Sequence, residues 1–131
     1  MILAFSILCI LCAYGVLSYA LTVQAKTTSE IPAQIISVVT KAQVKDHITS
    51  KAKQAGLSVS LVTAIAECES GFDKDIVGDH GNSYGVFQIH LPSHPNITKA
   101  QALDPIWATA WAIEKMKSGK WKMWSCYSMV V

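Results

Sequence analysis

The most informative part of the chain is residues 58–89, which read SVSLVTAIAECESGFDKDIVGDHGNSYGVFQI. Ser58 is a favourable N-cap residue, and the apolar side chains after it recur at helical spacing as far as Glu69. Gly71 follows, and glycine commonly stands just past the end of a helix. We therefore predict a helix that starts at Val59 and stops before Gly71.

The residues after this helix favour a tight loop. Residues 78–85 contain three glycines together with Asp79 and Asn82, which are both common in turns. Glycine adopts positive φ angles without steric cost, so we expect positive φ angles in this loop. The apolar residues 86–89 emerge from the loop and are too few to assign to a strand or a helix.

Two further segments before and after this region have helical spacing. Residues 44–55 carry apolar side chains at helical spacing with lysines between them, and this pattern predicts a helix ending at Gly56. Thr98 and Gln101 fit a capping box, which predicts a short helix. Residues 26–43 begin polar and then turn apolar, so we interpret them as a tether followed by a packing segment.

A fourth helix is predicted from Asp104-Pro105, an N-cap residue with proline at the first helical position. We expect it to run to Ser118, with Gly119 as its C-cap. Its expected core face consists of Ile106, Ala110, Ile113 and either Met116 or Lys117. No segment alternates long enough to suggest a sheet, so the sequence predicts one mainly α domain over residues 44–131.

The N-terminus differs from the rest of the chain. Residues 1–25 carry no charge, and residues 2–23 are nearly continuous in apolar and small side chains, enough for a helix to cross a bilayer core of about 30 Å. Residues 23–25 suit signal-peptidase cleavage, whereas the missing basic residue and the length of the run suit a retained anchor. Both interpretations stay open, and both predict that the domain is exported.

Residues 26–131 carry all of the charge, with 11 lysines, no arginine, 9 acidic residues and a net charge of +2. No basic run is dense enough to neutralise many phosphates, so we do not expect a nucleic-acid partner. Cys68 and Cys126 form an even pair in an exported domain. A bridge between them would close a loop of nearly 60 residues and stabilise the fold by about 4 kcal/mol, and two buried thiols are the alternative.

Glu69 is the residue best placed for chemistry. It continues the apolar face of Val62, Ile65 and Ala66 at the end of the helix, beside a glycine-bearing loop. Partial desolvation favours a protonated carboxyl, which can donate a proton to a leaving oxygen. A solvated Glu at a helix end is the alternative.

These residues carry a resemblance to a known family. Glu69-Ser70 at a helix end, followed about sixteen residues later by the Gly-x-x-Gln of Gly85–Gln88, resembles the signatures of the soluble lytic transglycosylase (SLT) family. The stretch from Gly78 to Gln88 also resembles goose-type lysozyme. The similarity covers roughly residues 44–127. It implies a small lysozyme-like helical fold that cleaves the β-1,4 bond between N-acetylmuramic acid and N-acetylglucosamine in peptidoglycan.

The resemblance also implies roles for the two carboxylates. Glu69 matches the catalytic acid, which in a transglycosylase then takes a proton from the C6 hydroxyl of the sugar and leaves a 1,6-anhydro end. Asp79 matches a second carboxylate, which a hydrolytic muramidase would use with Glu69 to activate water. Asp79 alternatively caps its own turn. The goose-type pattern has another acidic residue where this chain has His90, and this departure weakens the hydrolytic interpretation.

The resemblance suggests a set of substrate-binding residues, which are Ser70, Gly81, Ser83, Gly85, Gln88 and Tyr127. The residues around Tyr127 depart from the family pattern. For Gly81 and Gly85, turn geometry alone is the alternative role. We expect the tryptophans to be core residues more often than sugar platforms.

We expect no metal and no cofactor. His80, His90 and His94 do not have a zinc-binding spacing, because Pro92 interrupts helical geometry between the last two. The expected partners are peptidoglycan glycan strands, the membrane through residues 1–25 if they are retained, and an unidentified envelope-assembly or phage protein. A non-catalytic wall-binding or scaffold module remains the alternative from another functional class.

Overall fold

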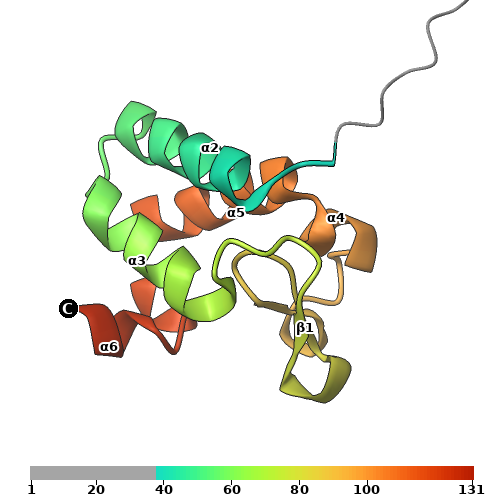
Figure 1. Cartoon of the computed structure of the whole chain (residues 1–131). Helices are drawn as coiled ribbons and strands as arrows, with labels where there is room; N and C mark the ends of the chain where they lie inside the picture. Colours follow the sequence, from blue (N-terminus) through green and yellow to red (C-terminus); the bar gives the residue numbers. More distant parts are fainter. Residues whose placement is uncertain (1–37) are drawn as a thin grey trace, which may run out of the picture. The chain divides into compact units, whose positions relative to one another are not determined.

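Residues 38–131, the part of the chain that this computed structural model describes, form five α-helices, three short strands and three 3₁₀ turns (Figure 1). The predicted mainly α class is confirmed for these residues. The helices are α2 (Lys41–Gln54), α3 (Val59–Ser70), α4 (Lys99–Leu103), α5 (Pro105–Lys117) and α6 (Tyr127–Val130).

Within residues 38–131, no helix has the length and the apolar character that crossing a membrane requires. The predicted signal peptide or anchor at residues 1–25 and the tether up to residue 37 lie outside the described residues. The predicted division of the chain at residues 25 and 43 therefore stays a prediction.

The helix ends follow the caps read from the sequence. Ser58 accepts a hydrogen bond from the backbone of Leu61, Thr98 forms its capping box with Gln101, and Asp104 caps α5. Helix α2 begins at Lys41, earlier than expected, because Thr40 and Gln43 form a capping box that the sequence analysis overlooked. Helix α5 ends at Lys117 with Ser118 as C-cap, one residue before the expected end.

A small sheet, which the sequence did not predict, follows α3. Strands β1 (Val77–Gly78), β2 (Ser83–Tyr84) and β3 (Ile89–His90) pair antiparallel in that order. Each strand has two residues, too few for the alternation that marks a strand in a sequence. The expected positive φ angles are confirmed in the turn Asp79–Gly81, with φ 49° at Asp79, 54° at His80 and 92° at Gly81.

The core lies between α2, α3, α5 and the loop that carries the sheet. The buried face of α5 differs from the expected one, because Ile106 is 55% exposed and Ala110 is exposed. The residues of α5 that are buried are Pro105, Ala108, Thr109, Ala112, Ile113 and Met116. Small side chains at Ala108 and Ala112 let neighbouring elements approach the helix closely, and a search for large apolar residues overlooks them.

The C-terminal segment returns to α3. Trp124 is buried, and its Nε1 donates to the carbonyl oxygen of Phe87 at 3.0 Å. The structure has the predicted disulfide between Cys68 and Cys126, with their Cα atoms 5.9 Å apart. Figure 1 shows α6 beside the lower end of α3, away from the sheet, and α6 packs against α3.

Candidate active site

Glu69 lies in the last turn of α3, next to Ser70 and to Gly71, whose left-handed conformation turns the chain away from the helix axis. Its side chain is half-buried. Its Oε1 accepts hydrogen bonds from the backbone N–H of Cys126 at 3.1 Å and from the Ser125 hydroxyl at 3.3 Å. No hydrogen bond within residues 38–131 ends on Oε2, so that oxygen is the one available to a ligand.

Glu69 borders a cavity of about 370 Å³ between the end of α3, the sheet and the C-terminal segment. A second, more apolar cavity of about 290 Å³ adjoins it and reaches Trp111 on α5. The two cavities share Gln88, His90, Met123 and Trp124. We call them together the groove. A groove with one polar cavity and one apolar, aromatic cavity suits a ligand that has hydroxyl groups and apolar faces, such as a sugar.

Asp79 also borders the polar cavity of the groove. The sheet register places Ser83 between Gly78 and His90, and Asp79 is the residue after Gly78. Asp79 Oδ2 is 3.2 Å from His90 Nε2, and His90 Nδ1 is 2.8 Å from the Ser93 hydroxyl. The carboxylate of Asp79 is therefore engaged by a neighbouring side chain.

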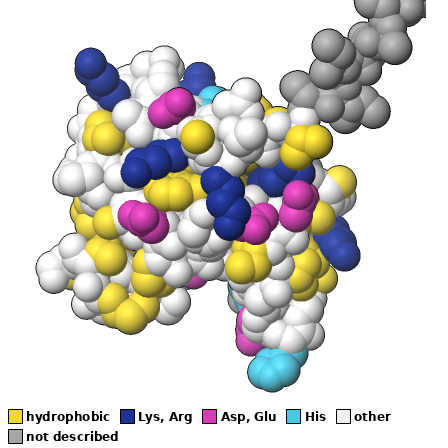
Figure 2. Space-filling view, viewed as in Figure 1, with side chains coloured by type: hydrophobic (Ala, Val, Ile, Leu, Met, Phe, Trp, Pro, Cys, Tyr) yellow, Lys and Arg dark blue, Asp and Glu magenta, His cyan; other side chains and the backbone are white. Residues whose placement is uncertain are grey.

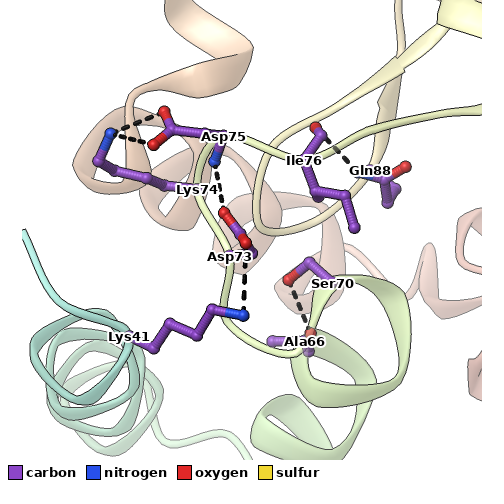
Figure 3. Close-up of polar contacts among 8 residues, drawn as sticks. All are labelled: Lys41, Ala66, Ser70, Asp73, Lys74, Asp75, Ile76 and Gln88. Carbon is purple, nitrogen blue, oxygen red and sulfur yellow. Dashed lines mark hydrogen bonds and ion pairs between the residues drawn. The ribbon is translucent and has the colours of Figure 1, made fainter.

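Gln88 borders both cavities, and its backbone has a positive φ of 44°. Its Nε2 donates to the carbonyl oxygens of Gly85 at 2.9 Å and Ile76 at 3.5 Å, the second of which is drawn in Figure 3. A Cβ atom added at Gly78 would lie 2.2 Å from Gln88 Oε1. Glycine at position 78 therefore leaves the space that the Gln88 amide occupies.

Residues 46–127 match the family model described as the transglycosylase SLT domain. The chain belongs to the SLT transglycosylase family. Every residue that borders the groove lies within the matched span. At the family level, membership implies a glycan-cleaving enzyme with peptidoglycan as its substrate. No curated protein and no solved structure matches the chain closely enough to add to this finding.

Two loop glycines of this SLT domain, Gly81 and Gly85, were predicted to bind substrate, and neither borders the polar cavity. A Cβ atom at Gly85 would lie 2.0 Å from the carbonyl oxygen of Ala102, so Gly85 allows the loop to pack against α4. Gly81 is exposed, and its carbonyl oxygen accepts a hydrogen bond from the Tyr84 hydroxyl at 2.5 Å. Their observed contacts are those of packing and turn geometry.

Of the other candidate binding residues of the SLT domain, some border the polar cavity and some do not. Ser83 is buried and borders the polar cavity beside Glu69. Ser70 is also buried, but its hydroxyl donates to the carbonyl oxygen of Ala66 within α3 (Figure 3). Tyr127 starts α6, stacks on Trp121 and borders neither cavity of the groove. It borders a third cavity of about 320 Å³, which shares Trp124 and Ser125 with the polar cavity. The structure thus brings together Glu69, Asp79, Ser83 and Gln88.

Two partners of Glu69 in the SLT domain, Ser125 and the backbone N–H of Cys126, were not predicted from the sequence. The predicted disulfide contains the signal for both. A bridge to Cys68 brings Cys126 within about 7 Å of the residue before Glu69, so the neighbours of Cys126 lie near the end of α3 that carries Glu69. Met123 and Trp124 belong to the same C-terminal segment and line the groove.

Charges of both signs are mixed over the face of the SLT domain shown in Figure 2.

In the apolar cavity, burial lowers the pKa of His94 from its usual 6.5, and the nearby positive charges of Lys115 and His90 lower it further. The His94 ring lies edge-on to Trp111, with the two ring centroids 5.0 Å apart. Among residues 38–131, no group of three or more His, Cys, Asp or Glu side chains is arranged to hold a metal ion.

Proposed function

We propose that this SLT domain is a lytic transglycosylase, which cleaves the β-1,4 bond between N-acetylmuramic acid and N-acetylglucosamine and leaves a 1,6-anhydro-muramic acid end. One observation carries the proposal. Of the two carboxyl groups in the groove, Glu69 is held only by neutral donors within residues 38–131, whereas Asp79 is paired with His90. A general acid must carry a proton at the start of the reaction, and a cationic partner would oppose this more strongly than the neutral donors of Glu69 do.

The hydrogen bonds of Glu69 also support its role. A protonated carboxyl group has one donor oxygen and one acceptor oxygen. Because the N–H of Cys126 and the hydroxyl of Ser125 both point at Oε1, the proton is expected on Oε2. Oε2 is the oxygen left available to a ligand, so the geometry suits donation of that proton to the glycosidic oxygen.

The proposed reaction needs no second carboxylate. Glu69 Oε2 gives its proton to the glycosidic oxygen as the bond from C1 of the muramic acid to that oxygen breaks. The charged Glu69 then takes the proton of the C6 hydroxyl group while the oxygen of this hydroxyl group bonds to C1. The product has an anhydro ring, no water is consumed, and Glu69 ends protonated as it began.

Hydrolysis by a muramidase is a second candidate, because Asp79 borders the same cavity as Glu69. In that reaction Asp79 would orient the attacking water. Its pairing with His90 at 3.2 Å favours the transglycosylase reaction, since the carboxylate would have to leave this partner or share it with water.

Mass spectrometry of the fragments that the purified chain releases from peptidoglycan tests the proposal. We expect anhydro products one water lighter than hydrolysis products, a loss of at least about 100-fold in Glu69→Gln, and most of the activity retained in Asp79→Asn. Reducing-end products that disappear in Asp79→Asn would establish the muramidase instead. A folded chain that releases nothing would support the wall-binding module.

We also propose that the domain is exported and faces the cell wall. Peptidoglycan lies outside the cytoplasmic membrane, and the Cys68–Cys126 disulfide is typical of an oxidising compartment. A reporter enzyme that works only outside the cytoplasm, fused after residue 37, should be active. A reporter that works only in the cytoplasm, fused at the same place, is the control, and its activity would contradict the proposal. The mass of the exported chain decides whether residues 1–25 are retained.

A further inference from the structure

The side chain of Glu69 is oriented from a distant part of the chain. Its hydrogen-bond donors, Ser125 and Cys126, lie 56 and 57 residues further along the sequence. Within residues 38–131, these two are the donors that its carboxyl group has. The direction of the carboxyl group therefore depends on how firmly the C-terminal segment is held against the end of α3.

Cys126 contributes to this arrangement twice. Its backbone N–H donates to Glu69 Oε1, and its sulfur is bonded to Cys68, the residue immediately before Glu69. The disulfide thus joins the two backbone segments between which this hydrogen bond forms. While the bridge is intact, the N–H of Cys126 cannot move far from Glu69.

The rest of the C-terminal segment has its own anchor. Trp124 is 5% exposed, bonds to the Phe87 carbonyl oxygen and packs edge-on against Phe87 and Trp111. Beyond it, Ser125 is exposed, and every residue of α6 is exposed or half-buried. Opening the bridge should therefore loosen residues 125–131 while Trp124 keeps the groove wall in place.

We propose that the Cys68–Cys126 disulfide is a positioning device for Glu69, so that turnover by this domain depends on the oxidation state of the pair. The proposal rests on the role of Glu69 in the proposed function. Cys68 and Cys126 are positioning residues, because they act on the substrate through Glu69. Reduction by a dithiol transfers two electrons to the bridge. Each cysteine sulfur then carries one hydrogen, and the dithiol closes to a cyclic disulfide.

The test compares kcat and KM for the release of anhydro products by the full chain, oxidised and after reduction with dithiothreitol. A general acid that is misplaced by about 1 Å can lose two orders of magnitude in rate, so we expect kcat to fall about 10- to 100-fold. KM should change little, since the groove wall stays in place. Reoxidation should restore kcat, and the Cys68→Ser/Cys126→Ser double variant should have the low kcat with or without the dithiol.

Two single variants separate positioning from general loosening of the C-terminal segment. Ser125→Ala removes the second donor to Glu69, leaves the bridge intact and should lower kcat. Met129→Ala is the matched control, because its side chain in α6 is 66% exposed and has no hydrogen bond to Glu69. It should leave kcat unchanged.

Near-UV circular dichroism of the tryptophans reports whether the reduced domain is still folded. Full kcat in a reduced, folded domain overturns the proposal, and the proposed function survives if Glu69→Gln is inactive. Loss of the whole tryptophan signal together with activity also overturns it, because the bridge would then act on the entire fold. An oxidised, folded chain without any activity overturns the proposed function itself.

Discussion

At the scale of single residues, glycine is required at two positions of this protein for different physical reasons. Gly85 and Gly56 have nearly the same positive φ angle, 72° and 70°. A Cβ atom at Gly85 would lie 2.0 Å from the backbone oxygen of Ala102, whereas one at Gly56 would meet nothing within 4 Å. Both positions disfavour other residues through backbone strain, but only Gly85 adds a collision with α4.

We predict different costs for the two substitutions to alanine. Gly56→Ala should lower the free energy of unfolding by about 1 kcal/mol, the cost of a left-handed alanine. Gly85→Ala should lower it by about 2 to 4 kcal/mol, because overpacking adds to the same strain. Urea unfolding of both variants checks this, and equal losses would show that the loop moves away from α4 without cost.

At the scale of elements, one face of α5 is packed against the core and another is exposed to solvent. Ala112 is fully buried, whereas Ala110, two residues before it, is exposed. Ala112→Leu should lower the free energy of unfolding by about 1 to 3 kcal/mol through overpacking, and Ala110→Leu should change it by no more than about 0.5 kcal/mol. Thermal unfolding of the pair measures the difference. A larger loss of unfolding free energy in Ala110→Leu than in Ala112→Leu would indicate that the buried face is the one expected from the sequence.

The elements differ in how well the sequence predicts them. The starts of α3, α4 and α5 were predicted because Ser58, Thr98 and Asp104 cap backbone groups two or three residues away. The buried face of α5 was not predicted, because its alanines fit several faces about equally well. The sheet was not predicted either, since two-residue strands are stabilised by pairing rather than by a pattern of their own.

At the scale of the whole molecule, the fold holds two histidines in surroundings that oppose their protonation. Burial lowers the pKa of His94 below 6.5, and Lys115 and His90 act in the same direction. Burial also lowers the pKa of His47, as does Lys51, against an opposing effect of Asp104. His47 Nε2 is buried and has no hydrogen-bond partner within residues 38–131. Side chains from α2, β3 and α5 thus contribute to these two shifts.

These shifts predict how the stability of the domain depends on pH. Below pH 6.5 the unfolded chain binds protons at both histidines more readily than the folded domain does, so stability should fall as the pH drops from about 7 to 5. Well above pH 7 both histidines are neutral in either state and contribute no slope. Urea unfolding across this range measures the effect.

The His47→Gln/His94→Gln double variant is the control for this pH dependence. Its stability should depend on pH less steeply than that of the natural chain between pH 7 and 5. If the free energy of unfolding changes equally steeply with pH in both proteins, the pH dependence comes from other titratable groups.

The sequence alone determined the local features of this protein: the helix that stops before Gly71, the loop with positive φ angles, most of the helix caps, and the family resemblance that these residues carry. Each depends on residues only a few positions apart. Only the tertiary structure decided that Ser125 and Cys126 bond to Glu69, that His90 pairs with Asp79, and that Gly85 packs against α4 while Tyr127 stacks on Trp121. These contacts form when packing brings distant segments together, and no local preference of the chain encodes them.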